Sequence, residues 1–134
     1  MSMDRRFFSI GAALALVGVA AGAFGAHGLE GRVTVERLAT WDTAAQYQVV
    51  HALALLAVAW ATTVWPGRIT SAAGWLFVAG TLLFSGSLYL LVLTDTPWLG
   101  AVTPLGGLAF LAGWACLALA PRRRGSHRHE ETYR

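Results

Sequence analysis

The feature that most constrains this chain is a series of four long apolar runs that occupy most of its 134 residues. They cover about residues 7–26, 44–65, 72–93 and 98–120, and none of them contains a carboxylate. A helix of about 20 apolar residues spans the roughly 30 Å hydrocarbon core of a bilayer. Charged residues make up 13% of the chain, about half the share that is usual in soluble domains. The sequence therefore predicts an all-α fold, a four-helix transmembrane bundle in a single domain.

Arginine sets the expected orientation, because the chain has no lysine and ten arginines. With four spans, the two termini and the second loop share one side of the membrane. That side carries eight of the ten: Arg5, Arg6, Arg68, Arg122, Arg123, Arg124, Arg128 and Arg134. Only Arg32 and Arg37 fall on the opposite side. Positive charge marks the cytoplasmic face, so we expect both termini in the cytoplasm.

The basic stretch that ends the chain, residues 121–134, is interpreted as a disordered cytoplasmic tail beside the membrane lipids. Its arginines are also compatible with phosphate binding, but the positive charge is accounted for by topology. We therefore expect no nucleic-acid partner.

The first run has two interpretations. Its basic start, apolar core and Ala21-Gly22-Ala23 sequence are also typical of a cleaved signal peptide. Cleavage would leave three spans, whose two ends carry charge that no longer agrees with one side. Small residues at Gly11, Ala15, Gly18 and Gly22 form a ridge that suits close helix packing in lipid. We expect the segment to be retained and the ridge to pack within the bundle, with dimerisation as the alternative.

Hydropathy alone does not define where the helices of the second and fourth spans begin. A helical pattern over residues 34–65 would be about 48 Å long, too long for the hydrocarbon core alone. We expect residues 34–41 to form a short interfacial helix, with Trp41 at headgroup depth and a bend or turn before the second span. In the fourth segment, the helix begins at Pro97 and kinks near Pro104, or it begins at Pro104 after a surface turn. The sequence leaves both possibilities open.

Polar side chains gather at one depth of the predicted spans. His51 lies about 10 Å into the second span, with Tyr47 and Gln48 one helical turn before it. The candidate polar cluster in the outer half of the bundle consists of His27, Tyr47, Gln48, His51, Ser85, Tyr89 and Thr103. Polar groups inside a membrane usually face the protein interior, so we expect interhelical hydrogen bonds. His27 in particular is expected to point inward, toward Tyr47, Gln48 or His51.

Few kinds of chemistry have support in these residues. Two histidines could ligate a haem from opposite sides, but His27 is predicted at the rim rather than level with His51. The absence of span carboxylates argues against a proton relay. Cys116 is the single cysteine, which supports neither a disulfide nor a metal cluster. With no nucleophile motif, phosphate loop or zinc spacing, we expect no enzyme, no cofactor and no metal.

Four motifs resemble a known family. "GAFGAHGL" (22–29), "WDTAAQYQVVHALALL" (41–56), "LFSGSLYLL" (83–91) and "TPLGG" (103–107) are similar to domain of unknown function 423, whose members are related to transmembrane protein 256. The resemblance covers about residues 7–118, in order, and leaves the arginine-rich tail outside. It implies a small four-span protein of a bacterial inner membrane. It also places His27, Gln48, His51, Ser85, Ser87, Tyr89 and Thr103 within family motifs, and it supplies no activity.

For function, the sequence therefore favours a structural or accessory membrane component that acts through helix packing, as a homo-oligomer or in a larger membrane complex. The alternative is a binder or transporter of a small molecule or lipid that uses the candidate polar cluster.

Overall fold

The computed structural model describes residues 1–122, which form four long α-helices and two short helical turns. The elements are α1 (Met3–Phe24), the π-helical turn η1 (Gly25–Leu29), α2 (Val35–Val64), α3 (Arg68–Thr94), the 3₁₀ turn η2 (Pro97–Ala101) and α4 (Thr103–Leu119). Each long helix, with the turns that extend it, is long and apolar enough to cross a membrane. The predicted all-α fold with four spans is confirmed. The tail prediction falls almost wholly on residues 123–134, outside the described part of the chain.

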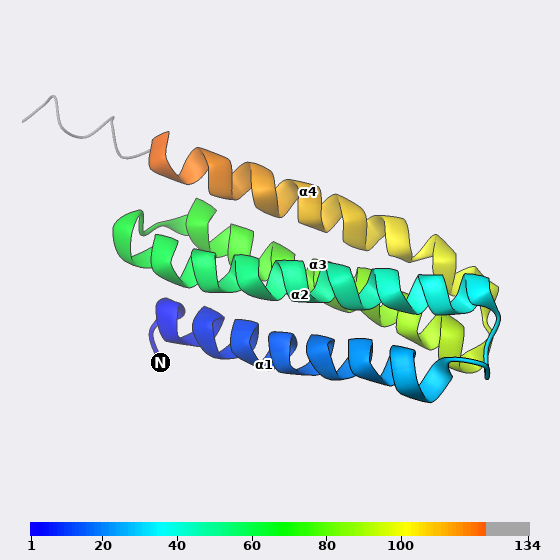
Figure 1. Cartoon of the computed structure of the whole chain (residues 1–134). Helices are drawn as coiled ribbons and strands as arrows, with labels where there is room; N and C mark the ends of the chain where they lie inside the picture. Colours follow the sequence, from blue (N-terminus) through cyan, green and yellow to red (C-terminus); the bar gives the residue numbers. More distant parts are fainter. Residues whose placement is uncertain (123–134) are drawn as a thin grey trace, which may run out of the picture.

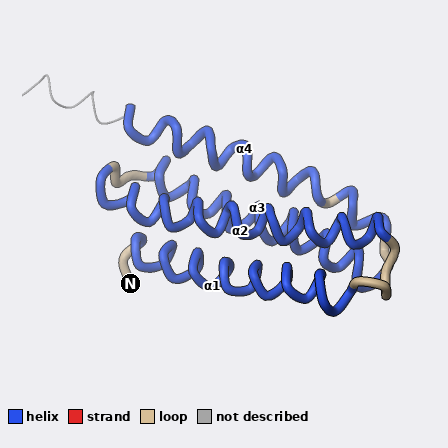
Figure 2. The backbone as a smooth tube through the Cα atoms, in the orientation of Figure 1, coloured by secondary structure: helices blue, strands red, loops and turns tan. Residues whose placement is uncertain are grey.

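The helices run up and down in sequence order (Figure 1). α2 and α3 form a central pair, α1 packs along one side, mainly on α2, and α4 packs along the other side on α3. The connections between them are short (Figure 2). The N-terminus, the α2–α3 connection and the end of α4 therefore lie at the same end of the molecule.

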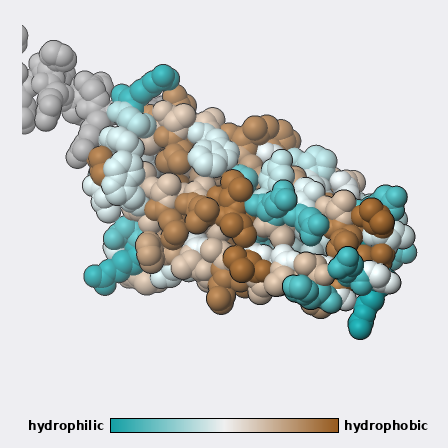
Figure 3. Space-filling view, viewed as in Figure 1, coloured by the Kyte–Doolittle hydropathy of each residue, from teal (hydrophilic) through white to brown (hydrophobic). Residues whose placement is uncertain are grey.

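The core lies around the α2–α3 pair and is closed by one aromatic ring from each outer helix. Phe7 of α1 and Phe77 of α3 are fully buried, with Phe110 of α4 nearly so. Large apolar residues elsewhere on the outer helices, such as Leu16 and Leu111, are exposed. In the space-filling view, hydrophilic side chains gather mainly toward the two ends, with a smaller patch between them (Figure 3). This distribution fits a bilayer around the middle of the bundle.

Glycines spaced seven residues apart set the α1–α2 contact. A Cβ atom at Gly11 would lie 2.8 Å from the Ala52 carbonyl oxygen, and one at Gly18 would lie 2.8 Å from the Val49 side chain. At Gly25, the same atom would lie 2.6 Å from the Trp41 ring. A seven-residue repeat keeps one side of a helix on its neighbour, as in coiled coils.

The predicted ridge on α1 is therefore half right. Gly11 and Gly18 pack on α2, and Ala15 is partly buried. A Cβ atom at Gly22, in contrast, would meet nothing within 4 Å. The four-residue spacing from Gly18 to Gly22 drifts around the helix, away from the contact line that Gly25 follows.

Glycines also allow close packing between α3 and α4. A Cβ atom at Gly106 would collide with the Phe84 backbone, and one at Gly113 would lie 2.7 Å from the Phe77 ring. From the α3 side, Gly80 faces the Phe110 ring in the same way. Without these glycines, α4 could not approach α3 so closely, and close approach matters because lipid provides no hydrophobic drive for helices to associate.

The predicted interfacial helix is not a separate element, and the bend before the second span is wrong. α2 is one continuous helix from Val35, with Thr34 as the N-cap that accepts from the Arg37 amide at 3.2 Å. Trp41 is buried rather than set among headgroups, since its indole N–H donates to the Ala21 carbonyl oxygen at 2.7 Å. That contact ties the first turns of α2 to the end of α1.

At the fourth segment, the structure selects the second of the two possibilities. Pro97–Ala101 is a 3₁₀ turn at the surface, and α4 begins at Thr103 with Pro104 in its first turn. Proline is tolerated there because the first amides of a helix have no intrahelical partner.

Candidate functional site

Gln48 is the centre of a hydrogen-bonded bridge across three helices. Its side-chain amide donates to the Leu14 carbonyl oxygen of α1 at 2.9 Å. Its amide oxygen accepts from the Tyr89 hydroxyl of α3 at 2.8 Å. Close by along α3, the Ser85 hydroxyl donates to the Ala44 carbonyl oxygen of α2 at 2.7 Å. Interhelical bonds of this kind fix the rotation of each helix about its axis.

A second polar contact joins α3 to α4. The Ser87 and Thr103 hydroxyls lie 2.7 Å apart, and Ser87 also donates to the Phe84 carbonyl oxygen at 3.0 Å. Ser87 is two residues from Ser85 and Tyr89, so it points to the other side of α3.

His51 occupies a third place, on the side of α2 that faces α4. Its Nδ1 lies 2.7 Å from the Tyr47 carbonyl oxygen, and its Nε2 accepts from the Trp114 indole N–H at 3.1 Å. A carbonyl oxygen only accepts, so Nδ1 carries the proton and the ring is neutral. The imidazole is stacked on the Phe110 ring, with centroids 3.5 Å apart and planes at 7°.

The predicted cluster is thus divided among separate contacts. Gln48, Ser85 and Tyr89 meet between α1, α2 and α3, Thr103 pairs with Ser87, and His51 pairs with Trp114. Within residues 1–122, no buried side-chain nitrogen or oxygen lacks a hydrogen-bond partner. The interior polar groups therefore bond to one another and to the backbone.

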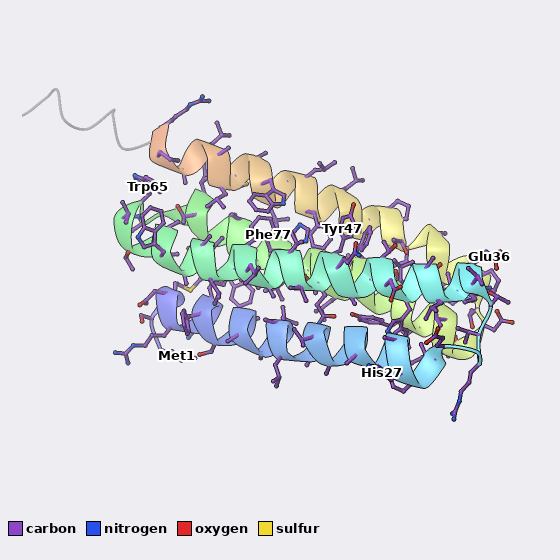
Figure 4. The ribbon with its side chains drawn as sticks, viewed as in Figure 1. Met1, His27, Glu36, Tyr47, Trp65 and Phe77 are labelled. Carbon is purple, nitrogen blue, oxygen red and sulfur yellow. The ribbon has the colours of Figure 1, made fainter. Side chains whose placement is uncertain are left out.

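The prediction for His27 is wrong. Its side chain is exposed, and it lies at the outer edge of the α1 end in Figure 4. The reason is the π-helical turn: Gly25 and Leu29 are the buried residues of that segment, and both face Trp41 or its neighbours. His27 is two residues from each, on the opposite side of the turn. It therefore does not come together with His51.

Between α2 and α4, the structure holds an aromatic cleft of 590 Å³. Its walls are formed by Tyr47, His51, Phe84, Pro104, Gly107, Leu108, Phe110, Leu111 and Trp114. Figure 4 shows Tyr47 and Phe77 reaching from the central pair toward α4. Of these residues, the sequence singled out Tyr47 and His51. Phe110 and Trp114 lie four residues apart, a spacing that could have indicated a shared aromatic face.

On the other side of α2, an open groove of 480 Å³ runs along α1. We call it the α1–α2 groove, and it is lined by Gly18, Val19, Gly22, Ala45, Gln46, Val49 and Val50. Gln46 is exposed and has no hydrogen-bond partner among the described residues. Gln46 was not predicted from the sequence, although Gln46 and Gln48 are two positions apart and cannot both face inward on one helix.

Comparison with known proteins shows which family the chain belongs to. The family described as "Protein of unknown function (DUF423)" matches residues 21–107. The UPF0382 membrane protein YwdK of Bacillus subtilis is 48% identical over 115 residues, covering 85% of this chain and 94% of its own. UPF0382 membrane proteins of Staphylococcus aureus and Staphylococcus haemolyticus are 45% and 42% identical over 114 residues. In each case the match covers 85% of this chain and 93% of the relative. No solved structure matches the chain.

Four membrane-capable helices with an internally bonded polar interior define a small polytopic membrane protein. Within that class, the chain belongs to the DUF423 family, in agreement with the resemblance of its motifs.

Proposed function

We propose that this protein is a structural or accessory component of the bacterial inner membrane. In this role it acts without enzymatic activity, by lateral helix association with a second copy of itself or within a larger complex. The observation that carries the proposal is Gln46, an exposed amide within the second apolar run. Polar side chains in membrane spans are costly toward lipid and usually face protein, and glutamine is one of the residues that hydrogen-bond between membrane helices.

The surroundings of Gln46 support the same role. The α1–α2 groove beside it is floored by Gly18, Gly22 and Ala45, so another helix backbone can approach closely. Gly22 has open space where a side chain would be, in contrast to the glycines that pack within the bundle. The interior polar groups are paired internally, which favours this role over a solute path through the candidate polar cluster.

The association is tested with the full chain in liposomes, by counting photobleaching steps at low protein density. The wild type should form dimers, while Gln46→Leu and Gly22→Leu should shift the population toward monomers. Gly86→Leu is the matched control, because a side chain at Gly86 also meets open space but lies outside the groove. A wild type that stays monomeric as density rises would refute self-association.

We further propose that both termini face the cytoplasm, because Arg5, Arg6, Arg68 and Arg122 lie at that end and four more arginines follow in the sequence. The test uses single cysteines in a Cys116→Ser background. Glu30→Cys, in the α1–α2 connection, should react with an impermeant maleimide in intact cells. Ser2→Cys should react only after permeabilisation, and the reverse pattern would overturn the orientation.

A further inference from the structure

The aromatic cleft lies between α2 and α4 because the backbone of α4 approaches α3 closely. The contacts of α4 with α2 are made by side chains, notably Phe110 and Trp114 on His51. Gly106 and Gly113 bring α4 against Phe84 and Phe77 of α3, whereas the extensive helix contacts are α1–α2, α2–α3 and α3–α4. The space left between α2 and α4 opens sideways, within the apolar part of the molecule. Its 590 Å³ lies within the usual range of small-molecule sites, roughly 300–1,000 Å³.

The cleft is walled by flat rings, several of which are stacked on one another, while the Trp114 ring stands at 61° to His51. The Tyr47 ring plane lies at 27° to Phe84, 24° to Phe110 and 17° to His51. The ring centroids of Tyr47 and Phe84 are 4.5 Å apart. Aromatic walls favour a flat ligand, because a planar ring can stack on one side chain and meet another edge-on.

One polar group in the cleft is free to bind a ligand. The Tyr47 hydroxyl has no hydrogen-bond partner within residues 1–122, and its residue is 44% exposed. His51 is already committed, because one ring nitrogen donates to the Tyr47 carbonyl and the other accepts from Trp114. The cleft therefore offers a hydroxyl donor beside flat apolar walls.

We propose that the aromatic cleft binds the planar head group of a membrane-soluble quinone, or of another flat ring that carries carbonyl oxygens on an apolar tail. The ring lies among the aromatic side chains that line the cleft, and a carbonyl oxygen accepts from the Tyr47 hydroxyl. The tail leaves past the exposed Leu108 and Leu111 into the bilayer. The proposal concerns binding, and it goes beyond the lateral association of the α1–α2 groove, which lies on the other side of α2.

The test measures equilibrium binding of decylubiquinone to the full chain in phosphatidylcholine nanodiscs, with empty nanodiscs subtracted. The blocking variant is Gly107→Leu, because Gly107 lines the cleft and a side chain there meets nothing within 4 Å. Gly86→Leu is the matched control outside the cleft. Leu111→Trp enlarges an exposed side chain at the rim of the cleft. It serves as a second blocking variant in case Gly107→Leu does not fold. Circular dichroism and gel filtration confirm the fold of each.

We expect saturable binding of one quinone per chain. Both blocking variants should weaken it at least tenfold, and Gly86→Leu should leave it unchanged. Tyr47→Phe should weaken it about tenfold, which is the effect of one lost hydrogen bond. Decane, which has the tail alone, should not compete.

Several results would overturn the proposal. One is non-saturable uptake that is equal in all variants, which is partition into lipid alone. Another is full binding in the blocking variants that fold. If decane competes with decylubiquinone at equal concentration, the cleft binds an alkyl chain rather than the quinone ring. If Tyr47→Phe binds with undiminished affinity, the Tyr47 hydroxyl does not bind the ligand, and the argument for a ligand with carbonyl oxygens is lost. Dimerisation is measured separately, so its loss or persistence does not bear on this result.

Discussion

The Trp114 indole N–H points at Nε2 of His51, 3.1 Å away, and so joins α4 to α2 across the aromatic cleft. The bond determines which nitrogen of His51 carries its proton, because the other nitrogen faces the Tyr47 carbonyl oxygen. A histidine held in this way acts as a fixed polar link between α2 and α4, two helices whose extensive contacts are with other helices.

This link should be measurable as a coupling free energy. Trp114→Phe and His51→Phe each keep an aromatic ring and remove the bond, so each should lower the free energy of unfolding. The double mutant should lose less than the sum, by about 0.6 kcal/mol, the average for interhelical hydrogen bonds in membranes. Unfolding by dodecyl sulfate in mixed micelles gives the four values, with Trp98→Phe at an exposed surface position as the control. Strict additivity would contradict the bond.

The two neighbouring glutamines should behave oppositely in the same assay. Gln48→Met leaves the Tyr89 hydroxyl and the Leu14 carbonyl without their shared partner, so we expect a loss of about 1–3 kcal/mol in the free energy of unfolding. Gln46→Met removes an exposed side chain without a partner and should change it by less than about 0.5 kcal/mol. The measurement is made on monomeric protein, so that association through the α1–α2 groove does not contribute. Equal losses would mean that Gln48 is not the bridge.

Adjacent glycines on α4 provide a third test. A methyl group at Gly106 would collide with the Phe84 backbone, while one at Gly107 meets open space. We expect Gly106→Ala to cost about 1–3 kcal/mol through overpacking. Gly107→Ala should be neutral or stabilising, since alanine is the better helix former by up to about 1 kcal/mol. Thermal unfolding in detergent compares the two variants. A larger loss of stability at Gly107 would mean that α4 does not pack on α3 with its Gly106 side.

His27 should be energetically independent of His51. Because His27 is exposed at the end of α1, His27→Ala should alter stability by less than about 0.5 kcal/mol. Its effect should add to that of His51→Ala within about 0.3–0.5 kcal/mol, as for separate sites. A coupling well above that range, obtained from thermal unfolding of the single and double variants, would show that the two histidines share a network after all.

The four spans were predictable because hydropathy and charge are properties of the chain in one dimension. The directions of side chains were not, since each residue turns a helix by about 100° and packing fixes the starting angle. Gln48 was placed inside correctly, while its neighbour Gln46 went unnoticed. The π-helical turn adds a further shift that apolar periodicity does not reveal, and His27 was misplaced for that reason. The seven-residue glycine spacing was a readable signal: the predicted ridge contained Gly11 and Gly18 but continued to Gly22 rather than to Gly25.

The helices of the bundle differ in length. α2, with 30 residues, is about 45 Å long, and α4, with 17, is about 26 Å. A hydrocarbon core of roughly 30 Å matches neither. α2 must tilt or extend beyond the core, while α4 spans it together with the turns that extend it, over residues 97–122. The surplus length of α2 carries Glu36, Arg37 and Asp42. α2 therefore fits a core of that thickness by extending its first, polar turns beyond the hydrocarbon, which avoids the cost of hydrophobic mismatch.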